Sequence, residues 1–206
     1  RAAASLFGGG DDATMPENPI SSELSHMRPS LLPGLLRAAA RNQARGFMDL
    51  ALFEAGHIFA GGEPGDQRFM VAGLLTGRTG QKDVLGSSRS VDLYDAKADA
   101  EAVLAAIGAP AKVQILRGAP GWWHPGRHGM IGLGPKKIMG IFGELHPRVL
   151  REMDVKGPAV AFTLWPDEVP LPRRSGAGRP ALVLNDLQAV ERDFAFVVDA
   201  KLAAGE

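Results

Sequence analysis

The side chains that could carry out chemistry are few and lie far apart in the sequence. Glu54 stands in an apolar run, residues 47–59, where a carboxylate could bind a substrate or, as we favour, be satisfied by hydrogen bonds near a strand end. His124, His128 and His146 could suggest a metal, but two of them precede proline and no spacing matches a zinc motif. We therefore expect no metal site, and we interpret His146 as a residue at the start of a helix.

Two adjacent tryptophans, Trp122 and Trp123, lie near Arg127 and could stack on RNA bases. We favour a partly buried aromatic patch at a loop or subunit contact, because tryptophan is also enriched there. The sequence has no phosphate-binding loop, dinucleotide fingerprint or nucleophile elbow. It also has no cysteine, which excludes disulfides, thiolate metal sites and cysteine nucleophiles. The residues thus predict no catalytic and no cofactor-binding site.

Composition places the chain among globular proteins. It has 206 residues, of which 45% are hydrophobic, and its 23 basic and 23 acidic side chains cancel. A neutral chain has no overall field that attracts nucleic acid, so any RNA contact requires a local patch. No apolar run reaches the roughly 18 to 20 residues that span a bilayer, so we expect no membrane partner. The absence of cysteine is compatible with a reducing cytoplasm, which is the location that we expect.

The first elements that the pattern predicts are a helix and a hairpin. Apolar residues from Leu31 to Ala39 recur at helical spacing, with Pro33 tolerated in the first turn. Residues 47–59 and 68–75 are apolar on both faces and flank a glycine-rich turn. We therefore predict that they form two central strands of one hairpin.

Further along the sequence, the pattern predicts more helices and strands. A 3.6-residue period runs from Leu93 to Ile107, with Ser90 or Asp92 available as a cap and Gly108 as a stop signal. Strands are predicted near residues 113–115, 130–133, 138–145 and 160–165, and a short helix at 147–153. Hairpin-linked strands interrupted by helices predict an α+β fold, an antiparallel β-sheet flanked by helices.

Both ends of the chain have a different composition. Residues 1–17 are rich in turn formers and predict an irregular leading segment, with order beginning near Ile20. Residues 171–187 are rich in proline and arginine and predict a linker. The opening residues carry no signal sequence, and we expect this chain to be a fragment of a longer protein.

Four segments carry a resemblance to a known family, the beta subunits of bacterial phenylalanine-tRNA ligases. They are residues 18–36 (NPISSELSHMRPSLLPGLL), 49–59 (DLALFEAGHIF), 124–127 (HPGR) and 143–147 (GELHP), in the family's order and spacing. Residues 189–194 (AVERDF) also resemble the start of the family's ferredoxin-like anticodon-binding domain, although the usual proline is replaced by Gln188.

The resemblance implies a class II aminoacyl-tRNA synthetase-like, non-catalytic module over residues 18–170. Residues 188–206 would then hold the truncated first strand of the anticodon-binding domain. The implied partner is a catalytic alpha subunit in an (αβ)2 enzyme that attaches phenylalanine to tRNA, with ATP and magnesium bound elsewhere in that holoenzyme. Self-association of the isolated fragment is a further possibility that the sequence leaves open.

Class II catalysis needs arginines on the sheet to stabilise charge that develops on the ATP α-phosphate. By the resemblance, Phe53 stands where one arginine is expected and Ile138 where another is expected. We therefore predict that this module cannot activate an amino acid. Residues that would form a vestigial pseudo-site are Glu54, His124, Arg127, Glu144 and His146.

The resemblance also suggests where the partner binds. Residues 21–36 carry more apolar side chains than one helix stripe can bury, so some should remain exposed in the isolated chain. The residues assigned to this surface are Leu24, Met27, Arg28, Leu31 and Leu35.

Two alternative functions remain open at this stage. A module that still binds phenylalanine or ATP could use Arg28, Arg41, Arg45 and Glu54. An RNA-contacting platform would need one basic face made of Lys136, Lys137, Arg148, Arg151, Arg173 and Arg174.

Overall fold

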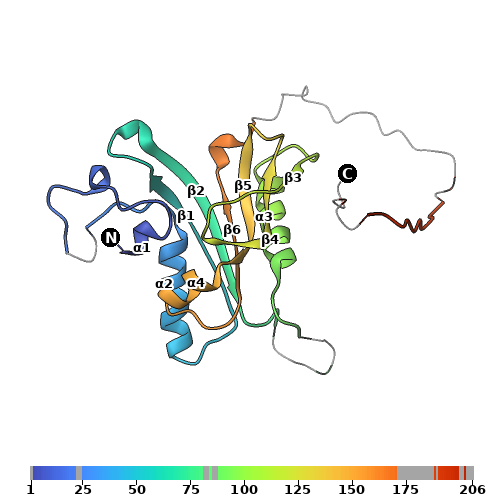
Figure 1. Cartoon of the computed structure of the whole chain (residues 1–206), viewed down its shortest axis with the longest axis horizontal. Helices are drawn as coiled ribbons and strands as arrows, with labels where there is room; N and C mark the ends of the chain where they lie inside the picture. The colour runs from blue at the N-terminus through green and yellow to red at the C-terminus, as the bar shows by residue number, and fades with distance from the viewer. Residues whose placement is uncertain are drawn as a thin grey trace. The chain divides into compact units, whose positions relative to one another are not determined.

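The chain divides into two units, Arg1–Leu171 and Pro172–Glu206, in a computed structural model, and the labelled helices and strands belong to the first (Figure 1). The structure describes residues 2–21, 25–80, 84, 88–170, 188, 190–199 and 202. In the second unit, the described residues 190–199 belong to no helix or strand, and the rings of Phe194 and Phe196 stack with centroids 6.3 Å apart. The linker predicted at 171–187 lies outside the described residues.

One six-stranded antiparallel sheet organises the first unit, in the order β1-β2-β6-β5-β4-β3. The strands are β1 (Leu50–Phe59), β2 (Gln67–Thr76), β3 (Gln114–Leu116), β4 (Trp123–Gly132), β5 (Ile138–Leu145) and β6 (Ala159–Leu164). Hairpins join β1 to β2 and β4 to β5, as their turn sequences predict. The predicted fold class, α+β with a helix-flanked antiparallel sheet, is confirmed.

The position of β1 differs from the prediction. It pairs with β2 as expected, but it forms the edge of the sheet, because the other side of β2 is taken by β6. Side chains of β1 accordingly alternate between partly buried and exposed positions along most of the strand. Its apolar sequence on both faces therefore does not indicate a central strand.

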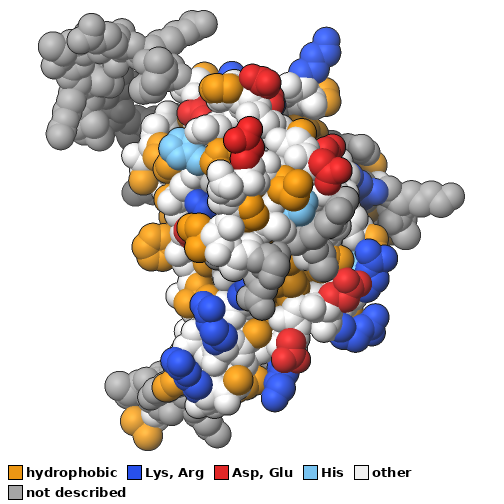
Figure 2. Space-filling model, turned by 90° about the vertical axis from the view of Figure 1, so that its left-hand side faces the viewer, with side chains coloured by type: hydrophobic (Ala, Val, Ile, Leu, Met, Phe, Trp, Pro, Cys, Tyr) orange, Lys and Arg blue, Asp and Glu red, His pale blue; other side chains and the backbone are white. Residues whose placement is uncertain are grey.

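Helices cover both faces of the sheet. The helix α2 (Leu32–Ala44) begins with proline in its first turn and packs with α4 (Pro147–Glu152) into one core that includes Leu36, Leu74 and Val149. On the opposite face, α3 (Leu93–Ala106) packs mainly on β5 and β6 through Ala96, Ala100 and Leu104. The side of the molecule near α1 and α2 mixes hydrophobic and charged side chains, with Lys and Arg gathered toward its lower part (Figure 2).

Local signals explain the limits of these helices. Asp92 and Asp95 form a capping box at the start of α3, in which each side chain accepts a hydrogen bond from the other residue's backbone N–H. The helix ends at Ala106, two residues before Gly108, which adopts a positive φ of 80°. Of the two caps that the sequence offered, Asp92 is the one used.

The leading segment is more ordered than predicted. Residues Ala2–Ser5 form a helical turn, α1, and Phe7 is buried in the core, with its ring centroid 5.7 Å from that of Trp122. Order therefore begins well before Ile20. The prediction was wrong because turn-former density says nothing about one phenylalanine that can pack on a distant surface.

Candidate functional site

The carboxylate of Glu54 is satisfied by an arginine from another segment. Arg28 forms an ion pair with it, and the Arg28 Nε also donates a hydrogen bond of 2.8 Å to the carbonyl of His57. The guanidinium lies so close over Gly56 that a side chain there would collide with it. Because both partners are partly exposed, the pair stabilises the fold by less than about 1 kcal/mol. The carboxylate of Glu54 is thus satisfied, as predicted, although it lies in the middle of β1 and not near a strand end.

The other candidate residues lie on the far half of the sheet. Arg127 on β4 donates a hydrogen bond of 2.8 Å to Glu144 on β5. Strands lie about 4.8 Å apart, and β1 is separated from β5 by three such steps, so Glu54 is roughly 14 Å away from this pair. Of the five residues predicted as a vestigial pseudo-site, His124, Arg127, Glu144 and His146 therefore lie near one another on β4, β5 and the start of α4, and Glu54 lies apart from them.

The histidines act locally on the backbone. His146 is the N-cap of α4, where its Nδ1 accepts a hydrogen bond of 3.1 Å from the Arg148 N–H, which confirms its predicted place at a helix start. His124 Nδ1 accepts from the Gly126 N–H at 3.2 Å. Over the described residues, there is no group of three or more His, Asp or Glu side chains that could hold a metal ion.

The structure corrects the partner surface proposed from the sequence. Leu31 and Leu35 are 0% and 5% exposed and belong to the core under α2, so they offer no surface to a partner. Met27 is 38% exposed, and Arg28 is committed to Glu54. Leu24 lies outside the described residues. The buried side of α2 is wider than the sequence pattern predicts, because it shares one core with the sheet, α4 and Phe7.

The alternative site sets do not assemble either. Arg41 and Arg45 are exposed near the C-terminal end of α2, whereas Arg28 precedes the helix. Lys136 and Lys137 precede β5 while Arg148 and Arg151 follow it, roughly 27 Å further along the strand. Arg173 and Arg174 lie outside the described residues. Trp123 is buried in the core and Trp122 is partly buried against Phe7, which favours packing over RNA stacking.

A different surface, which the sequence did not reveal, surrounds β1. Phe53 is 82% exposed. It lies on the same face of the sheet as α3, but the helix does not cover it. Phe47 and Met48, just before the strand, are also exposed. Phe53 pairs in register with Gly73, which pairs with Phe162, so a row of two rings and a glycine crosses three strands. An apolar groove of about 290 Å³ lies beside this row, lined also by Ala102 and Val103 of α3.

The outer edge of β1 is open along most of its length. At one end the Phe59 N–H donates to the Arg28 carbonyl at 2.9 Å and the His57 carbonyl accepts from the Arg28 side chain, so both residues turn their backbone groups outward. Because these groups alternate sides along a strand, Ala51, Phe53 and Ala55 also face outward. Within the described part of the chain, nothing pairs with the backbone of these three residues.

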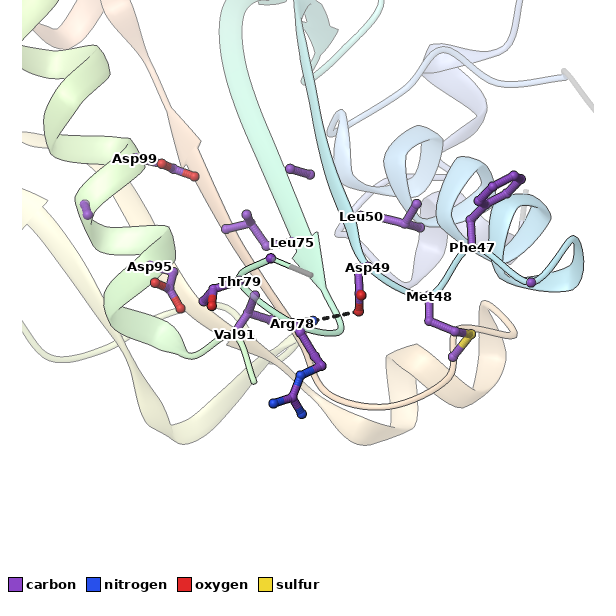
Figure 3. A pocket seen from close by; sticks show the side chains of 14 residues that line it. Phe47, Met48, Asp49, Leu50, Leu75, Arg78, Thr79, Val91, Asp95 and Asp99 are labelled. Atoms are coloured by element: carbon purple, nitrogen blue, oxygen red, sulfur yellow. Dashed lines mark hydrogen bonds between the residues drawn. The ribbon is translucent and has the colours of Figure 1, made fainter. Parts of the chain in front are cut away.

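A second hollow, of about 620 Å³, lies below this surface between the start of β1 and the start of α3 (Figure 3). Asp49 accepts a hydrogen bond of 2.9 Å from the Arg78 N–H, and Asp95 and Asp99 face the hollow from one side of α3. Arg89 donates two hydrogen bonds of 2.7 Å to Asp95. The spacing of Asp95 and Asp99, four residues apart, was the sequence signal that could have pointed to this acidic wall.

The two aspartates have opposite pKa shifts. The hydrogen bonds from Arg89 lower the pKa of the Asp95 carboxyl, and the charge of Arg89 acts in the same direction. Partial burial raises the pKa of the Asp99 carboxyl, and the nearby charge of Asp95 adds to this effect.

The sheet itself provides little material for phosphate chemistry. Its six strands, all of them described, carry two arginines and no lysine. Arg127 is neutralised by Glu144, and Arg68 is exposed beside the β1–β2 turn. None of the helices in the described chain is long and apolar enough to cross a membrane.

The fold defines a class of protein. A solved structure of a pyrrolysyl-tRNA synthetase from Desulfitobacterium hafniense is similar, with a TM-score of 0.55 over 80% of this chain and 56% of that chain. The two sequences are 13% identical, so this likeness concerns the fold alone. The antiparallel sheet with its helices is therefore of the tRNA synthetase class II type.

The sequence comparison names the family. The family model described as "Phenylalanyl tRNA synthetase beta chain CLM domain" matches residues 3–165, and the chain belongs to this family. Curated proteins named phenylalanine–tRNA ligase beta subunit are 78% identical in Ruegeria pomeroyi and 52% identical in Rhodospirillum rubrum, over 99% and 98% of this chain. The chain spans about a quarter, 26%, of the length of each of these relatives.

Proposed function

We propose that this chain is a non-catalytic scaffold that docks the catalytic alpha subunit of a phenylalanine-tRNA ligase. The holoenzyme, an (αβ)2 assembly in the cytoplasm, would attach phenylalanine to tRNA at the expense of ATP. Membership of a beta-chain family supports the existence of an alpha partner. The single observation that carries the docking role is the open edge of β1 with its exposed Phe53.

A long, regular edge strand normally needs protection. Natural proteins protect such edges with lysine, proline or bulges. Over its ten residues β1 contains none of these, and its register with β2 is continuous. An exposed edge of this kind accepts a strand from another chain, and apolar neighbours such as Phe47 and Met48 add side-chain contacts. Burying Phe53 would contribute about 1.5–3 kcal/mol before the costs of association.

The residues that are present do not fit ATP or magnesium. Phosphate binding needs several free cations, yet Arg127 is paired with Glu144 and Arg28 with Glu54. Among the described strand residues, this leaves Arg68 as a single arginine without an ion pair. A magnesium site built from carboxylates would need an acidic cluster, which the described residues lack. We therefore assign ATP, magnesium and the activation of phenylalanine to the alpha subunit.

The test replaces Phe53 with aspartate and measures binding to the cognate alpha subunit by co-purification, together with the Tm of the free chain. Because the ring is exposed, the fold should survive while binding is lost. Tyr94→Asp is the matched control, since Tyr94 is an exposed aromatic residue on α3. Unchanged binding of a well-folded Phe53→Asp chain would reject this docking surface.

A further inference from the structure

The outer side of α2 carries a row of unneutralised arginines. Arg37 and Arg41 belong to α2, and Arg45 is the C-cap residue directly after it. The three recur every four residues, so they lie on one side of the helix and are spaced by about 6 Å along its axis. All three are exposed, and none forms an ion pair among the described residues. The helix contains no acidic residue, so the like charges at this spacing weaken it slightly. We call these three residues the α2 arginine stripe.

The α2 arginine stripe lies on the side of α2 opposite its buried side, and the helix is held firmly in the fold. Leu32, Leu36 and Ala39 fix the inner side of α2 in the core. At the far end, the buried Gln43 side chain donates to the Lys156 carbonyl at 3.0 Å and accepts from the Lys156 N–H at 2.8 Å. This clamp joins α2 to the segment after α4, more than a hundred residues further along the chain.

That second segment brings further cations to the same side of the molecule. Arg151 of α4 and Lys156 are both exposed and have no ion pair among the described residues, whereas Arg148 is 3.4 Å from Glu152. Figure 2 looks onto this side and shows Lys and Arg side chains gathered over its lower part. The same segment also carries the exposed acidic residues Glu152 and Asp154, so the excess of positive charge is greatest along α2 itself.

We propose that the α2 arginine stripe binds the phosphate backbone of RNA. A line of cations at regular intervals matches a polymer whose anions also recur regularly, and guanidinium groups bind phosphate oxygens in a forked geometry. That the polymer is RNA, rather than another polyanion, rests on the proposed function, in which tRNA is a substrate.

The binding should not depend on base sequence. The two amide side chains of α2, which could read a base edge, are already engaged with the backbone: Asn42 donates to the Ala38 carbonyl at 2.8 Å, and Gln43 forms the clamp. The arginines then remain for the phosphates. Contacts to phosphates alone position an RNA without specifying its sequence. The stripe would therefore hold RNA in place while other parts of the holoenzyme select it.

The experiment measures the affinity of a tRNA transcript for the 206-residue chain between 50 and 200 mM salt, alone and with the alpha subunit. The test variant is the triple Arg37→Gln, Arg41→Gln, Arg45→Gln. The control is the triple Lys112→Gln, Arg117→Gln, Lys136→Gln, which removes the same charge from exposed positions outside α2. Glutamine keeps helix propensity, so both variants should fold, which the Tm verifies.

Three phosphate contacts make the slope of log affinity against log salt steeper by about 2 to 3. The wild-type chain should therefore lose about 20- to 40-fold more affinity over this salt range than the stripe variant, and the control should behave like wild type. Equal slopes for the wild type and the stripe variant, or equal losses in both variants, would overturn the proposal.

The alpha-subunit arm separates this proposal from the docking role. Loss of alpha binding by the stripe variant with an unchanged RNA slope would make the stripe a protein-docking surface and reject RNA binding. Failure of the wild-type chain to bind alpha would reject the scaffold function, whereas a stripe-dependent salt slope in that same chain would still support a phosphate-binding surface.

Discussion

Individual residues decide how closely the strands of this sheet can pack. Gly73, in the middle of β2, lies between Phe53 on β1 and Phe162 on β6, and a Cβ atom at this position would run into the Phe162 ring. The ring is buried in the core beneath α3, so it cannot swing away into solvent. The absence of a side chain at Gly73 is therefore a packing requirement.

Gly73→Ala should destabilise the fold by about 1–3 kcal/mol, because a well-packed core accommodates an added methyl group only with strain. Urea unfolding measures the loss. Gly65→Ala is the matched control, since no atom lies within 4 Å of the Cβ that it would add. An equal effect of the two substitutions would show that lost glycine flexibility, rather than the Phe162 ring, determines the cost.

Two aspartates on one side of α3, Asp95 and Asp99, have opposite effects on the stability of the fold at neutral pH. Asp95 has a lowered pKa, so its carboxylate stabilises the fold above the unfolded-state pKa of about 3.9, and this contribution is lost as the pH falls through the folded-state pKa. Asp99 has a raised pKa, so its contribution is present below about pH 3.9 and is lost as the pH rises through its folded-state pKa.

Asp99→Asn should therefore raise the Tm at pH 7, and the gain should vanish as the pH falls below about 3.9, because the carboxyl then becomes protonated in both the folded and the unfolded state. Asp95→Asn should lower the Tm at pH 7, and its effect should persist to a lower pH than that of Asp99→Asn. Melting curves at several pH values compare the two variants directly. Shifts of the same sign at pH 7 would contradict the opposite pKa directions.

Among the elements, β1 stands out because its position conflicts with its composition. A strand with Ala51, Phe53 and Ala55 on its outward backbone positions is suited to a neighbour that the described chain does not supply. Only its last residues are covered, by the segment around Arg28. The outer edge is thus covered at His57 and Phe59 and open from Ala51 to Ala55.

A proline substitution tests whether a partner strand pairs with the open part of this edge. Ala55→Pro removes an N–H that points away from β2, so the β1–β2 ladder should stay intact and the Tm should change little. A partner strand would lose a backbone donor and meet the proline ring, so alpha-subunit binding should fall sharply. Ala55→Ser, which keeps the N–H, should bind normally. If co-purification is equal for both variants, strand addition at this edge is rejected.

At the largest scale, the first unit combines a synthetase-type sheet with only two arginines and no lysine on its six described strands. The arginines on its strands are few, and the acidic groups near α3 face a different hollow from the pair formed by Arg127 and Glu144. Without preorganised cations, the charge that develops in phosphoryl chemistry is not stabilised. This is the physical basis of the non-catalytic role that we propose for the chain.

The chain alone should show no phenylalanine-dependent exchange between ATP and pyrophosphate. Addition of the cognate alpha subunit in the full assembly should restore exchange, and the Phe53→Asp chain should fail to do so at limiting concentrations. The preparation has to be verified free of host synthetase. Robust exchange by the purified chain would refute the division of roles proposed for the two subunits.

Local pattern in the sequence was sufficient for much of this architecture. The 3.6-residue period of residues 93–107, the turn between β4 and β5 and the cap at His146 all depend on neighbours within a few residues. These features, with four family segments in order, predicted the α+β fold and the family. The satisfied state of Glu54 also followed, because a carboxylate in an apolar strand needs a partner wherever that partner comes from.

Only the tertiary structure determined which surfaces are free. Periodicity indicates that a side of a strand is apolar, but strand order depends on pairings between distant segments, so the edge position of β1 was not predictable. Leu31 and Leu35 became core and Phe53 became surface for the same reason. Burial is a property of all the elements that surround a residue, and those elements come together only when the whole sheet has formed.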